Sequence, residues 1–206
     1  MQIITIYPYG FGSNTYALTA DGKTAVVIDP AQPRVADELK GRGLEAKFVL
    51  LTHCHFDHIG GTELLQERGA KVLCLDEEKP LFGTSADLCG LFGAPPVTFT
   101  IDQALCDNEE ISLCGMRFRA LHTAGHTKGS ACYLCETQEG ERYLFAGDTL
   151  FAGSIGRTDF PTGDMGAMRE SLRRLCALDD MPVYAGHNEP TTLETEKKTN
   201  PFIIDL

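Results

Sequence analysis

The stretch Phe48-Val49-Leu50-Leu51-Thr52-His53-Cys54-His55-Phe56-Asp57-His58 joins an apolar run directly to three imidazoles and a carboxylate. The apolar run predicts a buried strand, and the polar residues then fall in the loop that ends it. Because alternate residues of an extended chain share a face, His53 and His55 can point to one centre. Asp57 and His58 can then reach a second centre beside it. Imidazole and carboxylate are ligands of divalent cations, so this stretch is typical of a catalytic metal site.

Three more metal-ready side chains lie farther along the chain, each after a strand-like run and beside a glycine: His126, Asp148 and His187. Three protein ligands for each ion would leave an open position for water, which a catalytic ion requires. The first predicted ligand set is His53, His55 and His126, and the second is Asp57, His58 and His187. We predict that Asp148 bridges the two ions, because two carboxylate oxygens can bind two cations at once.

Such a pair of ions can supply the nucleophile of a hydrolase. Two cations about 3.5–4 Å apart can share one hydroxide, and metal binding can lower the pKa of water from about 15.7 to about 7. A nucleophile would then exist at neutral pH without a serine or a cysteine. We predict Asp57 and Asp148 as the catalytic residues. Two divalent ions are the expected cofactors, with zinc the expected metal, and iron or manganese would also suit these ligands.

Other interpretations of single residues stay open. An isolated histidine is more often a surface or hydrogen-bonded residue than a ligand, and we apply that interpretation to His122, which has no partner of its own. Asp57 could lie outside the ligand set of a one-metal site. Asp148 could instead cap the turn that follows it.

Composition narrows the classes of function. The length of 206 residues suits one domain, residues 1–206. The 18 Lys and Arg against 29 Asp and Glu give a net charge of −11, which argues against a nucleic-acid partner, because phosphate contacts depend on clustered cations. The chain has no signal-peptide pattern at Met1–Pro8 and no apolar run that could span a bilayer. We therefore expect a cytoplasmic protein without a membrane partner, either a monomer or a small homo-oligomer.

The eight cysteines are scattered through apolar segments. Without a secretory signal, we expect reduced packing thiols rather than disulfides. Cys132-x-x-Cys135 lies in a predicted strand, where positions three apart face opposite sides. No second pair has a zinc spacing, so we predict two core residues there rather than metal ligands or a redox pair.

The order of apolar runs predicts an α/β fold with two halves of similar order. The predicted strands are residues 2–7, 15–20, 24–29, 47–51, 71–75, 97–101, 110–113, 116–121, 130–135, 142–146 and 182–185. The predicted helices are residues 33–42, 62–68, 165–177 and 193–198, with short helical pieces between 76 and 95. Two sheets packed face to face with helices outside would bury every apolar face.

Four segments contain the candidate ligands together with glycine: Thr52–Gly61, His122–Ser130, Gly147–Phe151 and Gly186-His187. In this order they resemble the motifs of the metallo-β-lactamase superfamily across most of the chain. The segment Gly153–Pro161 is similar to the short, single-domain relatives of glyoxalase II, the hydroxyacylglutathione hydrolases. The resemblance implies a four-layer αββα sandwich, the metallo-β-lactamase fold, with the metals at one edge of the sheets.

The resemblance also implies an activity, the hydrolysis of a small-molecule thioester. A metal-bridging hydroxide would attack the carbonyl of an S-acylglutathione or a related thiol ester, and a thiolate would leave. Arg157 falls where full-length glyoxalase II places a Lys against the thiol substrate, so the resemblance implies a substrate contact there. The alternative is a structural arginine paired with Asp159.

A second resemblance implies a different function, that of a mononuclear-iron persulfide dioxygenase. Gly156–Phe160 is similar to a segment of those enzymes, which bind one iron through two histidines and one aspartate. Those ligands would be His126, Asp148 and either His53 or His55. The chain departs from the dioxygenase pattern at Ile155 and Pro161, where those enzymes have Cys and Gln, so hydrolysis is the leading hypothesis.

Three further classes are disfavoured. A nuclease could share the His-x-His-x-Asp-His motif, but the acidic balance of the chain opposes it. A flavin-linked electron carrier would need Glu in place of His55. A non-enzymatic zinc module would have a closed set of four ligands, usually rich in thiolates.

Overall fold

The computed structural model describes residues 1–206. The elements of the first half are β1 (Gln2–Ile6), β2 (Thr15–Thr19), β3 (Thr24–Ile28), α1 (Val35–Gly41), β4 (Glu45–Leu50), α2 (Phe56–Ile59), α3 (Thr62–Glu67), β5 (Lys71–Leu75), α4 (Cys89–Phe92) and β6 (Gln103–Leu105). The elements of the second half are β7 (Glu110–Leu113), β8 (Met116–His122), β9 (Ala131–Glu136), β10 (Arg142–Gly147), β11 (Leu150–Phe151), β12 (Ser154–Ile155), α5 (Met165–Cys176), β13 (Pro182–Ala185), β14 (Thr191–Thr192) and α6 (Leu193–Thr199). Two 3₁₀ turns, Lys79–Leu81 and Ser85–Asp87, precede α4.

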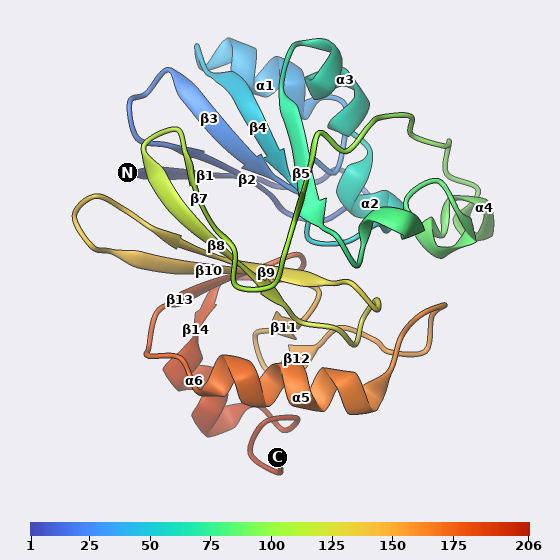
Figure 1. Cartoon of the computed structure of the whole chain (residues 1–206), viewed down its shortest axis with the longest axis vertical. Helices are drawn as coiled ribbons and strands as arrows, with labels where there is room; N and C mark the ends of the chain where they lie inside the picture. The colour runs from blue at the N-terminus through green and yellow to red at the C-terminus, as the bar shows by residue number, and fades with distance from the viewer.

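Two mixed sheets of six strands form the middle of the molecule. The strand order is β1-β2-β3-β4-β5-β6 in the first and β14-β13-β10-β9-β8-β7 in the second. Strands β3 to β6 are parallel, and β10 is parallel to β13. In Figure 1, α1 and α3 cover the outer side of the first sheet, and α5 and α6 cover the outer side of the second. The predicted αββα sandwich is confirmed.

The apolar side chains of each strand supply two cores, because successive residues point to opposite faces. In β4, Leu50 joins the core between the sheets, whereas Val49 packs under α1 and α3. In β9, Cys135 enters the core between the sheets and Cys132 enters the core against α5. All eight cysteines are unpaired. The prediction of packing thiols on opposite faces of this strand is therefore confirmed.

One predicted strand is wrong. Residues 97–101 alternate apolar and polar side chains, but they form an irregular segment, and β6 begins only at Gln103. The apolar residues of this segment pack against the outer core of the first sheet, and Gln66 of α3 bonds both the N–H and the C=O of Thr100. Its backbone thus pairs with a side chain instead of a neighbouring strand. The short elements α2, β11, β12 and β14 were not predicted.

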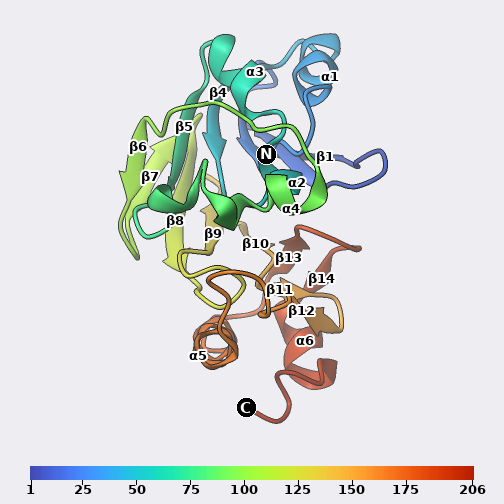
Figure 2. The ribbon, with the colours of Figure 1, turned by 90° about the vertical axis from the view of Figure 1, so that its right-hand side faces the viewer.

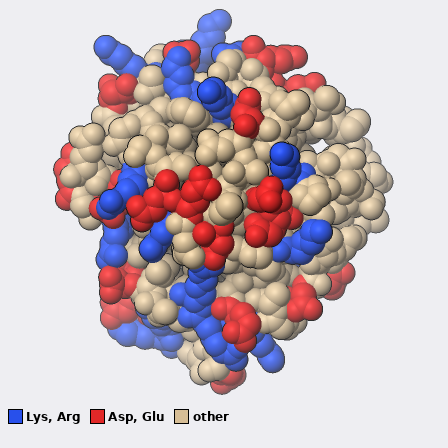
Figure 3. All heavy atoms as spheres, viewed as in Figure 1, with Lys and Arg blue, Asp and Glu red and all other residues tan.

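The surface carries both signs of charge. Figure 3 shows acidic side chains gathered across the middle of one face, with basic side chains above and below them and no continuous basic area. No helix combines the length and the apolar character that a bilayer crossing requires.

Candidate metal centre

All seven predicted ligands lie at one end of the sandwich, where strands of both sheets finish. His53 and His55 follow β4, and Asp148 and His187 follow the parallel neighbours β10 and β13. The carboxyl ends of parallel strands meet at one edge of a sheet, so residues far apart in sequence come together there. Figure 2 shows α2 and α4 above this end and the β11–β12 hairpin below it.

The first predicted set comes together. His53, His55 and His126 are all buried, and their ligand atoms lie within 4.8 Å of one another. Their ring centroids are 4.5–4.7 Å apart, and their planes cross nearly at right angles. Three imidazoles in this arrangement can share one cation, since each can direct one ring nitrogen to a common point.

The second predicted set comes together beside it. The ligand atoms of Asp57, His58 and His187 also lie within 4.8 Å of one another, and His187 Nε2 is 3.3 Å from Asp57 Oδ2. Asp57 therefore belongs to a second cluster and is not only a neighbour of the first.

The Asp148 carboxylate lies between the two sets. Its Oδ2 is 3.4 Å from His126 Nε2 of the first set and 3.5 Å from His187 Nε2 of the second. Its Oδ1 is 3.3 Å from His58 Nε2. One carboxylate thus faces both sets, as a bridging ligand must.

The inward-facing atoms of this cluster fit cations. Buried side-chain nitrogens or oxygens normally have a hydrogen-bond partner, because leaving one without any costs about 1–3 kcal/mol. The atoms without one here are Nε2 of His53, His55, His58 and His126, and Oδ1 of Asp148. All face the same space, and each can direct a lone pair to a cation once His58 has lost its proton. The fold and this cluster indicate divalent metal binding.

The outer nitrogens of three imidazoles are held by hydrogen bonds. His58 Nδ1 is 2.9 Å from Asp29 Oδ2, and His126 Nδ1 donates to the Arg157 carbonyl at 2.7 Å. His53 Nδ1 is 3.0 Å from the hydroxyl of Thr52, which itself donates to Asp29. A proton on Nδ1 leaves the lone pair of Nε2 directed inward, so these bonds orient the ligands and select the tautomer.

Asp29 was missed by the sequence analysis. It is buried, and its two oxygens accept from the N–H and the hydroxyl of Thr52 as well as facing His58. A signal was present in the sequence, because Asp29-Pro30 directly follows the apolar run of β3. Asp29 thereby joins the end of β3 to the histidine loop.

Burial and neighbouring charges act in opposite directions on the pKa values of His58 and Asp148. Burial lowers the pKa of His53 well below its usual value and lowers the pKa of His55 to about 3, so both are neutral at neutral pH. Burial also opposes charge on His58, but the carboxylates of Asp148, Asp57 and Asp29 outweigh it and raise its pKa well above the usual value. Burial raises the pKa of Asp148, but His58 and the other imidazoles reverse this and hold it below the usual range. Asp148 is therefore an anion.

Two glycines allow the loops that carry Asp148 and His187 to approach their neighbours closely. A Cβ atom on Gly186 would lie 2.3 Å from Asp148 Oδ1, and one on Gly147, whose φ is +48°, would lie 2.6 Å from the Thr52 hydroxyl. No side chain can be placed at either distance. The glycines beside Asp148 and His187 are thus required for packing as well as for the turn.

A second carboxylate that the sequence analysis missed, Glu78, ties the two ligand loops together. It is fully buried, and it accepts from the N–H of Cys54 at 2.7 Å, between the first two histidines of the motif. It also accepts from the Thr127 hydroxyl at 2.8 Å and the Gly129 N–H at 3.1 Å, just after His126. Burial raises the pKa of Glu78, although these hydrogen bonds oppose the shift.

We expect Glu78→Gln to weaken zinc binding by about 10–100-fold and to destabilise the metal-free protein by about 1–3 kcal/mol. The amide nitrogen cannot accept a hydrogen bond, so at least one buried donor loses its partner and the loops lose their tie. The measurements are zinc titration and thermal unfolding of the metal-free protein. Glu77→Gln is the matched control, because Glu77 is the exposed neighbour. Equal behaviour of the two variants would contradict this role.

Two residues discussed in the sequence analysis, His122 and Arg157, lie outside the ligand cluster. His122 lies apart from the predicted ligands, with Nε2 at 2.8 Å from the Lys128 carbonyl, as expected for a hydrogen-bonded histidine. The Arg157 guanidinium binds both oxygens of Asp159 at 2.7 Å and lies 3.7 Å over the Phe160 ring. This is the structural pairing of the alternative interpretation, and the substrate contact of Arg157 stays a prediction.

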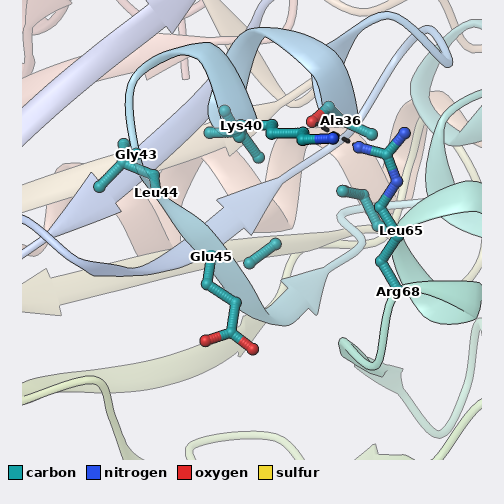
Figure 4. Close-up of a pocket in the computed structure, with 9 residues that line it drawn as sticks. Ala36, Lys40, Gly43, Leu44, Glu45, Leu65 and Arg68 are labelled. Atoms are coloured by element: carbon teal, nitrogen blue, oxygen red, sulfur yellow. Dashed lines mark hydrogen bonds between the residues drawn. The ribbon is translucent and has the colours of Figure 1, made fainter.

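A hollow of about 380 Å³ opens directly above the cluster and is lined by Asp57, His126 and Asp148 among others. Another hollow, of about 310 Å³, lies between α1 and α3 over the start of β4, with Lys40 and Arg68 near the apolar side chains Leu44 and Leu65 (Figure 4). That second hollow has a single carboxylate and no histidine. Of these two hollows, only the first has a set of metal ligands.

An αββα sandwich with such a cluster at its edge defines a metal-dependent hydrolase. The chain matches the model of the family described as "Metallo-beta-lactamase superfamily" over residues 8–187. It belongs to this superfamily. It is similar to "Hydroxyacylglutathione hydrolase GloC" of Haemophilus influenzae, with 36% identity over 211 residues that cover 98% of each chain.

Two solved structures extend the similarity. "BLEG-1 B3 metallo-beta-lactamase" has a TM-score of 0.88 at 31% identity, over 98% of this chain and 99% of that one. "TTHA1623 in a di-iron-bound form" has a TM-score of 0.82 at 32% identity, over 98% of this chain and 100% of that one. Of these two structures, only the second names a metal, which is iron. Elemental analysis of the purified protein decides between zinc and iron.

Proposed function

We propose that residues 1–206 form one domain that hydrolyses a small-molecule thioester with two divalent ions, of which zinc is the expected species. The observation that carries the proposal is the position of Asp148, whose carboxylate faces both imidazole sets at 3.3–3.5 Å. Ions bound there would lower the pKa of water and stabilise negative charge on the substrate oxygen. The similarity to a protein named hydroxyacylglutathione hydrolase supports the same activity.

The side chains of the hollow favour a thioester over an amide. A model thiol has a pKa of about 8.5, so a thiolate can leave without taking up a proton, whereas an amine leaving group needs a proton donor. The titratable residues that line the hollow are Arg157 and the predicted ligands His55, Asp57, His126, Asp148 and His187. Arg157 keeps its protons at neutral pH, so no side chain outside the ligand set is suited to act as a general acid.

The residues of the chain would bind and orient the substrate, while the ions would activate water and polarise the carbonyl of the substrate. The His53, His58 and His126 rings are held by hydrogen bonds to Thr52, Asp29 and the Arg157 carbonyl. Rigid ligands keep the reacting groups in place, which lowers the entropy lost on reaching the transition state. The hydrophobic residues that line the hollow would exclude bulk water from the scissile bond.

The experiment that tests the function combines metal content with product analysis. The protein is purified without added metal, its metals are counted by elemental analysis, and it is given S-lactoylglutathione. About two ions per chain and thiol release without oxygen uptake would support the proposal. About one iron per chain, with oxygen consumed on glutathione persulfide, would overturn it in favour of the dioxygenase alternative.

We expect zinc binding at pH 7 to release at least about one proton per chain, because a cation at His58 Nε2 must displace the proton held there and metal-bound water can lose another. His53 and His55 release none, since burial keeps them neutral. The pKa of His58 is raised only in the metal-free state, so zinc affinity should rise with pH until His58 loses its proton. The measurement is calorimetric titration of zinc in two buffers with different ionisation enthalpies. A binding enthalpy that is identical in both buffers would contradict it, and His122→Ala should release as many protons as the unmodified chain.

A further inference from the structure

The hollow above the metal cluster has an aromatic wall. Seven of its thirteen lining residues are hydrophobic, and five of these are phenylalanines: Phe11, Phe56, Phe92, Phe151 and Phe160. They come from five separate parts of the chain, namely the loop before β2, α2, α4, β11, and the segment after β12. The tertiary structure thus gathers on one wall aromatic residues that no sequence motif connects.

Three of these rings form a continuous surface beside the first ligand set. Phe56 and Phe92 are stacked with centroids 5.1 Å apart, and Phe92 meets Phe160 edge to face at 5.9 Å. Phe160 in turn meets the His55 ring at 5.9 Å. An apolar group that lies on Phe92 and Phe160 would therefore be within reach of a carbonyl held at the metal cluster.

The wall is open to solvent in the absence of a ligand. The side chain of Phe92 is 51% exposed and that of Phe11 is 90% exposed. Clustered exposed aromatic side chains are unusual on a soluble surface and mark sites where a ligand covers them. Apolar burial is the main stabilising contribution that this wall can offer to a bound molecule.

The wall offers no free positive charge. Arg157 is its one cationic residue, and both Nε and Nη2 of its guanidinium already bind the Asp159 carboxylate at 2.7 Å. A carboxylate on an acyl group packed against this wall, away from the metal cluster, would thus lose water without gaining an ion-pair partner.

We propose that the acyl group of the substrate is aromatic or otherwise bulky and apolar, and that Phe92 and Phe160 bind it and determine specificity. This inference rests on the proposed thioester hydrolysis. Common thiol carriers are polar, so the apolar part of such a substrate is its acyl group. In the reaction the oxygen of water bonds to the carbonyl carbon, the C–S bond breaks, and its electron pair leaves with sulfur. The products are a carboxylate, a thiol or thiolate, and any proton released to solvent.

The test compares three thioesters of one neutral thiol, N-acetylcysteamine, that differ only in their acyl group: acetyl, phenylacetyl and succinyl. We expect kcat/KM for the phenylacetyl ester to exceed that for the acetyl ester by about tenfold or more, mainly through KM. The succinyl ester should be the poorest substrate of the three, because its carboxylate has no partner on the wall.

Variants of Phe92 and Phe160 test whether these two rings cause the preference for the phenylacetyl ester. Phe92→Ala and Phe160→Ala should each reduce the ratio of the phenylacetyl to the acetyl kcat/KM by about fivefold, and Phe92→Leu should retain most of it. Leu91→Ala is the matched control, since Leu91 is 67% exposed on the same short helix but does not line the hollow. All three side chains lie outside the main cores, so these variants are expected to fold.

The outcomes separate this inference from the function on which it rests. If the acetyl and phenylacetyl esters release thiol equally well, or if Phe92→Ala and Leu91→Ala give the same ratio, the assignment of the aromatic wall is overturned and thioester hydrolysis stands. If neither these esters nor S-lactoylglutathione release thiol in the zinc-loaded protein, thioester hydrolysis itself fails, and the inference fails with it. If only S-lactoylglutathione does, the inference alone is overturned.

Discussion

Asp148→Asn is expected to lower kcat/KM for thioester hydrolysis by at least about 10³-fold, which corresponds to about 4 kcal/mol of transition-state stabilisation. Asparagine has nearly the same volume, but it is neutral and one of its two terminal atoms cannot bind a cation. Asp148 faces both ligand sets at 3.3–3.5 Å, so its replacement weakens both ion positions together. The variant should also hold fewer zinc ions per chain, which elemental analysis measures.

The fold should survive this change. Asp148 Oδ1 has no hydrogen-bond partner within the protein, and the residue lies in a loop after β10 instead of within a core. Circular dichroism of the variant should therefore match that of the unmodified chain. Asp179→Asn is the matched control, because Asp179 pairs with Arg142 at the surface, 3.0 Å away, and should leave activity unchanged. Activity of Asp148→Asn within about tenfold of the unmodified protein at full metal content would refute the bridging role.

His126→Ala is expected to lower kcat/KM by about 10³-fold or more, with loss of metal from the first set. This set has three imidazoles, and His126 is its one member outside the His53–His58 loop. Its Nε2 is buried without a partner, while its Nδ1 bonds the Arg157 carbonyl. Removal of this ring would take one of four protein ligands from the first ion, so the ion would be held more weakly and less rigidly.

The control for His126→Ala lies in the same segment of the chain. His122 is four residues earlier, and its Nε2 already bonds the Lys128 carbonyl. His122→Ala should change kcat/KM by no more than about threefold, as expected for a partly exposed side chain outside the site. Steady-state assays and zinc counts on both variants provide the comparison. Loss of activity in His122→Ala as large as in His126→Ala would show that this segment is needed for its structure and not for a ligand.

Much of the fold could be predicted from the sequence because the periodicity of apolar residues reports which faces are buried. The strands around the histidine motif and the helix at 165–177 lie within a few residues of their predicted bounds. Residues 97–101 show the limit of this reasoning. Their alternation requires one buried face, and packing against Gln66 and the outer core provides it without any neighbouring strand.

The candidate ligands could be predicted because metal chemistry limits the residue types, and because His126, Asp148 and His187 each stand beside a glycine after a strand-like run. The residues that orient the ligands could not be predicted in this way, because their role depends on partners far away in sequence. Glu78 is the third of three consecutive acidic residues, Asp76, Glu77 and Glu78, and the other two are exposed. Nothing in local composition distinguishes the one that is buried.

The sequence by itself determined that this protein has the ligands of divalent cations, since imidazoles and carboxylates at these spacings suit such ions and little else. Only the tertiary structure decided how that chemistry is held and what it meets. The buried carboxylates Asp29 and Glu78 and the aromatic wall around Phe92 are assembled from distant segments by the packing of two sheets. The physical reason is that ligand type is a property of single residues, whereas burial and contact are properties of the whole fold.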